Sequence, residues 1–283
     1  MRGWLRDLTD LVLPTDCAGC GAPRTALCAC CRTALAGSAP RRVRPQPEPA
    51  GLPAVYASAP YAEAVRALLL AHKERGALTL TGALGTALAR VVRAGLDASA
   101  GTGAGTAGTV VLVPVPSARW AVRARGHDPV RRMALAAAGE LRRTGTAARV
   151  AAVLRQRRPV ADQAELDARR RLANLAGALE VTAGGDRLLA GGRVVLVDDL
   201  ITTGASLAEA ARALRIGESR AVYKNATREV REERSTGGPE KAKWETGKWV
   251  HGAANKTPAN ALGPPLRAAV IAAPADSFER NRN

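Results

Sequence analysis

Short apolar runs alternate with amphipathic stretches along most of the chain. A continuous apolar run of about four to eight residues is typical of a strand that is buried in a parallel sheet. Such runs occur at Val110–Val115, Val150–Leu154, Arg193–Asp198 and Leu266–Ala273. Apolar positions that recur every three to four residues are typical of helices. They occur over residues 61–75, 80–92, 129–143, 163–177 and 206–214. This alternation predicts an α/β fold, with a parallel sheet flanked by helices.

Three segments lack these patterns. Residues 39–53 contain five prolines and predict an extended, semi-rigid linker between a small N-terminal module (residues 1–38) and a larger domain (residues 54–283). Residues 98–109 consist mainly of Gly, Ala and Thr, and predict a loop. Residues 216–263 hold five of the six lysines without a clear apolar period, and predict a flexible insertion before the last strand.

The composition excludes several classes of protein. Apolar residues make up 47% of the chain, which is too many for wholesale disorder, but aromatic residues make up only 3%. The core must therefore consist mainly of Ala, Val and Leu. No apolar run reaches the ~18 residues of a membrane span, and the N-terminus has no long apolar stretch after its charges. We therefore expect a cytoplasmic protein without an integral membrane segment.

The net charge of +17 favours an anionic partner. Nucleic acid, acidic lipid and phosphorylated small molecules all satisfy this condition, and charge alone does not choose between them. The basic residues are nearly all Arg, and the chain is also rich in Ala. GC-rich coding is therefore an alternative source of the charge.

All five cysteines lie within residues 17–31. Cys17 and Cys20 form one Cys-x-x-Cys pair, and Cys28 and Cys31 form a second. Two such pairs place four thiolates on two tight turns, which suits tetrahedral zinc, and four thiolates leave no open position for catalysis. The spacing thus predicts a structural Zn²⁺ site. A metal-free or redox-active pair of dithiols is one alternative, and Cys30 as a ligand in place of Cys28 or Cys31 is another.

The strongest pattern for chemistry is residues 194–206, VVLVDDLITTGAS. A buried strand ends in Asp198 and Asp199, and ligands of open α/β sheets bind at the carboxyl ends of the strands. Small hydroxyl residues and a Gly then open a helix, whose free amides favour an anion. The segment therefore offers acceptors for sugar hydroxyls beside donors for a phosphate. An ordinary helix cap at Thr203 or Ser206 explains one hydroxyl, but not the two adjacent acids.

Residues 194–206 resemble, at all thirteen positions, the phosphoribosyl pyrophosphate (PRPP) signature of the type I phosphoribosyltransferases. Together with the paired cysteines, they make the chain resemble the ComF family, which is associated with competence and DNA uptake. Shorter motifs of the family occur in the same order in this chain: Val113–Pro116 with Arg125-Gly126, and then Gln163 with Arg171 and Asn174. Lys73 lies where the family often has a lysine after its first helix. The family commonly has Phe-Asn-Gln where this chain has His127-Asp128-Pro129.

The resemblance implies a type I phosphoribosyltransferase-like sheet and transfer of ribose 5-phosphate from PRPP to an unidentified acceptor, with Mg²⁺ bound beside the pyrophosphate. Asp198 and Asp199 would be the catalytic pair and would accept hydrogen bonds from the ribose hydroxyls. The 5-phosphate would lie against Thr202, Thr203, Gly204, Ala205 and Ser206. Arg125 is the candidate for the pyrophosphate, and Gln163 and Arg171 are candidates on a lid. The acceptor would lie under a hood formed by residues 54–95, to which the zinc module could contribute.

Several alternatives stay open at this point. Arg169 and Arg170 suit a solvated helix face as well as a lid, and His127 suits a turn as well as a general base. The whole chain could instead be a non-catalytic accessory of DNA uptake that binds single-stranded DNA or a helicase partner. In that case the PRPP site would sense a metabolite or be vestigial. The long insertion could alter contacts in an oligomer.

Overall fold

The computed structural model describes residues 16–37, 39–100, 108–158, 160, 168–217 and 266–279. Most of the predicted insertion at residues 216–263 lies outside these ranges, as does Gln163. None of the described helices is both long enough and apolar enough to cross a membrane.

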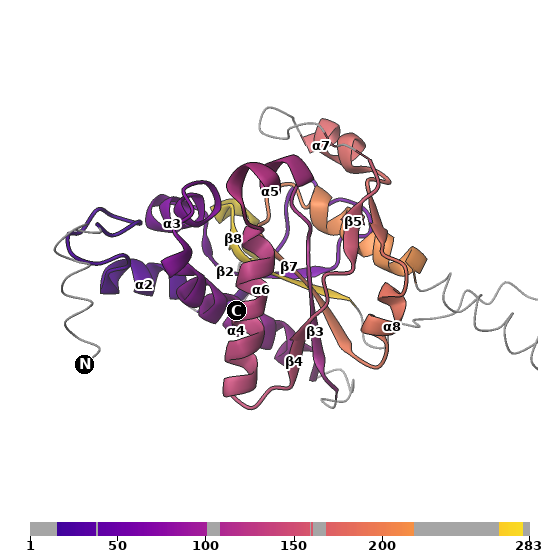
Figure 1. Cartoon of the computed structure of the whole chain (residues 1–283), viewed down its shortest axis with the longest axis horizontal. Coiled ribbons are helices and arrows are strands. Elements are labelled where there is room, and N and C mark those ends of the chain that lie inside the picture. Colours follow the sequence, from indigo (N-terminus) through magenta and orange to yellow (C-terminus); the bar gives the residue numbers. More distant parts are fainter. Residues whose placement is uncertain are drawn as a thin grey trace, which may run out of the picture.

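A six-stranded sheet forms the centre of the fold (Figure 1). Its strands, in spatial order, are β1 (Arg41–Val43), β2 (Ala54–Pro60), β8 (Arg267–Ala273), β7 (Arg193–Leu200), β3 (Val110–Pro114) and β4 (Ala148–Val150). Every neighbouring pair is parallel except β1 and β2. The structure thus confirms the predicted α/β class and its mostly parallel sheet. It also places β7, which carries the two acids, between β8 and β3 in the middle of that sheet.

Helices cover both faces of the sheet. One face packs against α3 (Glu63–Glu74), α4 (Thr81–Ala100) and α6 (Pro129–Arg143), and the other packs against the helix of residues 205–217. Along β7, Val195 and Val197 belong to the first layer, whereas Val194 and Leu196 belong to the second. Successive side chains of a strand point to opposite faces, so a strand covered on both sides is apolar throughout. The remaining helical elements are short: α2 (Ala29–Ala36), α5 (Arg119–Arg125), α8 (Gly185–Leu189), η1 (Leu78–Leu80) and η2 (Ala275–Ser277).

The fold has a second, two-stranded sheet, and α7 (Ala168–Leu175) lies between its two strands in the chain. Its strands, β5 (Leu154–Gln156) and β6 (Leu179–Val181), are antiparallel. The prediction of one strand over Val150–Leu154 is therefore wrong, because Val150 ends β4 and Leu154 begins β5. The amide of Val153 donates to the carbonyl of Ala151 at 2.9 Å, so the chain turns between the two strands. The turn residues Ala151 and Val153 are buried, which is why the apolar run shows no break.

Two helices differ from their predicted bounds. The prediction ended the second helix at Val92, but α4 continues to Ala100, into the segment predicted as a loop. Ala is the strongest helix former, and the last turns of α4 contain several. The helix predicted over residues 163–177 appears as α7 from Ala168 onward, because residues 161–167 lie outside the described ranges.

The proline-rich segment of residues 39–53 is more than a spacer. It contributes β1 to the edge of the sheet, and the amide of Arg44 donates to the carbonyl of Ser277 at 2.7 Å. Farther along, Arg215 Nη1 donates to the carbonyl of Gly51 at 3.2 Å. The segment therefore packs against the domain that it precedes.

Close packing between α4 and α6 depends on Gly85. A Cβ atom at Gly85 of α4 would lie 2.9 Å from the carbonyl carbon of Ala136 in α6. We expect Gly85→Ala to lower the free energy of unfolding by roughly 1–3 kcal/mol, because two packed helices must separate. Urea denaturation measures this change.

Gly139 provides the matched control for that substitution. It lies within α6 with no heavy atom within 4 Å of its added Cβ. Gly139→Ala should therefore stabilise the protein by up to about 1 kcal/mol through helix propensity alone. Equal effects of the two substitutions would contradict the assigned packing.

Candidate functional site

A cavity of about 980 Å³ opens at the carboxyl end of the parallel strands. β7 contributes Asp198 and Asp199, and the segment after β3 contributes Val115 and Pro116. Because parallel strands share one carboxyl edge, residues far apart in the sequence converge here. The remaining walls come from the last turn of α3, from α5 and from the β5–β6 sheet with α7.

The two acids differ in their surroundings. Asp199 is buried and accepts a hydrogen bond from Lys73 Nζ at 2.9 Å, and their side chains are 10% and 35% exposed. The charge of Asp199 raises the pKa of Lys73. Asp198 Oδ1 accepts from the amide of Asp199 at 2.9 Å. Burial, and then the charge of Asp199, raise the pKa of Asp198 well above its usual range. A shifted carboxyl beside a charged pair in a cavity is a common property of functional sites.

Residues 202–206 turn the chain from β7 into the helix of residues 205–217. Thr202 and Ser206 line the cavity, and Thr203, Gly204 and Ala205 form the turn between them. Gly204 has φ of +76°, and an added Cβ would lie 3.1 Å from Leu52 Cδ1. Glycine is thus required for its positive φ, and the tight packing of the proline-rich segment leaves little room for a side chain.

Arg125 is the arginine of α5 that faces the cavity. Its Nε donates to Glu74 Oε2 at 2.9 Å, and its buried Nη1 has no hydrogen-bond partner among the described residues. Arg119 and Arg123 of the same helix are exposed and lie outside the cavity lining. The structure therefore brings Arg125, rather than its neighbours, together with the acids.

The segment His127-Asp128-Pro129 has a structural role in this chain. Asp128 is the N-cap of α6, where its side chain accepts from the amide of Arg131 at 3.0 Å, and Pro129 occupies the first helical turn. The His127 ring contacts two backbone carbonyls, Nδ1 that of Arg125 at 3.1 Å and Nε2 that of His72 at 3.3 Å. A neutral imidazole carries one N–H, so one of these contacts is a hydrogen bond. This bond holds the turn, which favours the structural interpretation of His127 over a general base.

One lid candidate, on α7, contacts a residue of the cavity lining. Arg171 Nη1 donates to Thr202 Oγ1 at 3.3 Å, whereas Gln163 lies outside the described residues. The arginines of the β5–β6 sheet and the loop after β5, which include Arg155 and Arg158, are largely paired within this sheet and α7. Arg155 forms an ion pair with Glu180 at 2.8 Å, and Arg158 Nη2 donates to the carbonyl of Asn174 at 2.7 Å.

The cavity lining also includes apolar side chains and an indole. Trp120 of α5 is 57% exposed and lines the cavity. Leu175 and Leu179 contribute from the β5–β6 sheet and α7. From the predicted hood of residues 54–95, the lining includes Lys73, Glu74, Arg75 and Gly76. Sequence analysis did not single out Trp120 or Glu74, since no spacing links either residue to the acidic pair.

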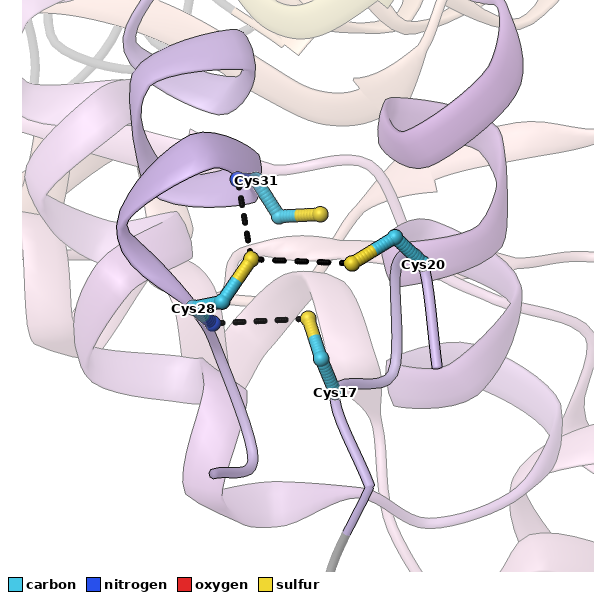
Figure 2. A group of neighbouring side chains, drawn as sticks. All are labelled: Cys17, Cys20, Cys28 and Cys31. Carbon is cyan, nitrogen blue, oxygen red and sulfur yellow. Dashed lines mark hydrogen bonds between the residues drawn. The ribbon is translucent and has the colours of Figure 1, made fainter. Parts of the chain in front are cut away.

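The four predicted zinc ligands converge at the start of the described chain. The Sγ atoms of Cys17, Cys20, Cys28 and Cys31 all lie within 4.8 Å of one another, and Figure 2 shows them around a common centre. A tetrahedral zinc with Zn–S bonds of about 2.3 Å requires S–S separations of roughly 3.8 Å, so small side-chain shifts suffice. Cys30 is exposed and lies outside this group. The donor set fits zinc, and Cys30 is not needed as a ligand.

The local backbone favours thiolates and close sulfur packing. Burial raises the pKa of Cys17, but amides of Cys28, Cys20 and Gly19 outweigh it and lower that pKa to about 6. Burial and the neighbouring sulfurs raise the pKa of Cys31. Four thiolates this close repel one another, and a cation would relieve that repulsion. An added Cβ at Gly19 would lie 2.7 Å from Cys31 Sγ, which explains the glycine there.

No family model and no curated protein matches the chain.

Proposed function

We propose that the cavity binds PRPP and that the protein is a phosphoribosyltransferase-like enzyme of the ComF type. It would transfer ribose 5-phosphate to an acceptor with release of pyrophosphate. The observation that carries this proposal is the convergence of Asp198 and Asp199, the hydroxyls of Thr202 and Ser206, and Arg125 around one cavity. A ribose needs acceptors for its hydroxyls, and its phosphates need donors, so this set of groups suits both halves of the ligand.

Different residues of the cavity bind the ribose, the 5-phosphate and the pyrophosphate of PRPP. The carboxylates of Asp198 and Asp199 accept from the ribose 2- and 3-hydroxyls, and residues 202–206 bind the 5-phosphate through hydroxyls and the amides at the helix start. Arg125 faces the pyrophosphate, where a guanidinium binds two oxygens at once. The bond between C1 of the ribose and the pyrophosphate breaks, and its electron pair leaves with the pyrophosphate. The acceptor forms a new bond to C1 and loses a proton.

Magnesium fits this site because the cavity offers carboxylate oxygens, which the ion prefers as ligands. Asp198 and Asp199 are the residues that would hold it, and bound Mg²⁺ would neutralise charge on the departing pyrophosphate. The carboxylates also stabilise positive charge that develops on the ribose ring during transfer.

Calorimetric titration of the zinc-loaded protein with PRPP and Mg²⁺ tests the proposal. We expect saturable binding at one site per chain, which weakens when Mg²⁺ is omitted. Ribose 5-phosphate and pyrophosphate, titrated separately, should each bind more weakly than PRPP, since each occupies half of the site. Pyrophosphate release in a screen of nucleobases and amines would then identify the acceptor.

Binding of single-stranded DNA is the outcome that would replace this proposal. It would follow from the charge of +17 and would weaken steeply with salt, by several powers of ten for about six phosphate contacts. A folded protein that binds DNA in this manner and takes up no PRPP would contradict the enzyme proposal.

A further inference from the structure

Three consecutive residues at the end of α3 each contact a different group at the cavity. The carbonyl oxygen of His72 lies 3.3 Å from His127 Nε2, Lys73 Nζ donates to Asp199 at 2.9 Å, and Glu74 accepts from Arg125 Nε at 2.9 Å. One helical turn thus joins β7 to α5, which lie on different sides of the cavity. Any displacement of this turn changes the position of both Asp199 and Arg125.

The middle of α3 packs against the cysteine cluster. Gly19 lies between Cys31 and Leu68 of α3: its Cβ position is 2.7 Å from Cys31 Sγ and 3.4 Å from Leu68 Cγ. Leu68 is fully buried in the same cluster of apolar residues as Cys17 and Cys31. Figure 1 shows α2 and α3 side by side, and these helices are in contact.

The packing around Leu68 contributes to the position of α3. Its N-cap residue, Ala62, makes no side-chain cap hydrogen bond, and Glu63 at its start has a positive φ of 40°. A helix without a cap loses about 1 kcal/mol of local stability. The packing of Leu68 in the cluster that contains Cys17 and Cys31 therefore supports a helix whose start has no side-chain cap.

We propose that α3 transmits the metal-loading state of the four-cysteine cluster to the cavity. With the metal bound, the cysteine loop is rigid and α3 holds Lys73 against Asp199 and Glu74 against Arg125. Without the metal, the loop loosens, α3 loses its support, and the two contacts weaken. The consequence for ligand affinity rests on the proposed function, but the structural coupling does not. Coupling between two sites of one protein typically changes affinity by about 5- to 150-fold.

Hydrogen exchange tests the coupling without any ligand. After zinc is removed with a chelator, the amides of residues 72–77 should lose at least about tenfold more protection than those of the helix of residues 205–217 on the opposite face of the sheet. Unchanged exchange at residues 72–77 would overturn the proposal. Equal loss of protection in both helices would also overturn it, since the metal would then support the whole fold rather than α3.

A pair of core substitutions separates α3 from general stability. Leu68→Ala keeps all four cysteines and should reproduce the faster exchange at residues 72–77 with zinc still bound. Leu214→Ala removes an equally buried leucine from the helix of residues 205–217 and is the matched control. Both should destabilise the protein, but only Leu68→Ala should change exchange at the end of α3. Similar exchange at residues 72–77 in both variants contradicts the assignment.

Calorimetry with PRPP and Mg²⁺ tests the consequence for the cavity. Zinc removal should weaken binding by the wild-type protein about 5- to 150-fold. The variant Lys73→Met/Glu74→Met should bind more weakly and should no longer depend on zinc, because its contacts to Asp199 and Arg125 are lost. Full zinc dependence in that variant would overturn the proposal. A loaded wild-type protein that binds no PRPP would instead refute the proposed function, while the exchange measurement still decides the coupling.

Discussion

Replacement of Cys31 by serine is expected to remove the zinc and to lower the melting temperature by roughly 10–15 °C. Cys31 is 1% exposed and belongs to the main cluster of buried residues, together with Leu35, Leu68 and Leu84. Loss of a structural metal is among the few changes that cost more than about 4–5 kcal/mol, and for a chain of this size each kcal/mol corresponds to roughly 2–4 °C. Differential scanning calorimetry and metal analysis measure the two effects.

Cys30 provides the matched control for this prediction. It is adjacent to Cys31, but it is exposed and lies outside the four-cysteine group. Cys30→Ser should keep one zinc per chain and shift the melting temperature by no more than about 1–2 °C, as expected for surface substitutions. A loss of zinc in Cys30→Ser, with zinc retained in Cys31→Ser, would show that the fifth cysteine is the ligand.

The fold class was predictable because buried parallel strands and amphipathic helices leave different periods in the sequence. Strand β7 shows the first of these, since Val194, Val195, Leu196 and Val197 are all buried although they point alternately to the two faces of the sheet. The apolar period fails where two strands meet at a buried turn, as between β4 and β5. It also fails where a run of Ala and Gly can form either helix or loop, as at the end of α4.

At the candidate site, the short motifs could be predicted from the sequence, whereas the long-range contacts could not. The acidic pair and the cysteine spacing are contained in short segments, so chemistry alone indicates them. The contacts of Glu74 with Arg125 and of Lys73 with Asp199 join residues 51 and 126 positions apart. Such pairs arise only when the sheet brings α3, α5 and β7 together, and no local pattern encodes them. No sequence pattern indicates the exposed Trp120 either, because its role depends on the cavity around it.

Substitution of either acid by asparagine should weaken PRPP binding about 10- to 100-fold, and the double variant should show no saturable binding. A hydrogen bond to a charged group contributes roughly 1.5–3 kcal/mol, and asparagine accepts a ribose hydroxyl less strongly than a carboxylate does. Calorimetric titration with Mg²⁺ present measures the loss. Asp276→Asn, an exposed site on η2, removes the same charge and should bind PRPP like the wild type.

The two single variants should change stability in opposite directions, which separates a ligand site from an ordinary structural pair. Burial raises the folded-state pKa of Asp198. The folded state therefore binds its proton more tightly than the unfolded state, and stability falls as the pH rises from about 4 through that raised pKa. Asp198→Asn removes this cost and should melt higher than the wild type at pH 7. Asp199→Asn leaves Lys73 without its anionic partner and should melt lower. A stabilised Asp198→Asn protein that still bound PRPP normally would exclude Asp198 from the ribose site, whereas gained stability with lost binding is the result expected of a carboxylate kept for a ligand.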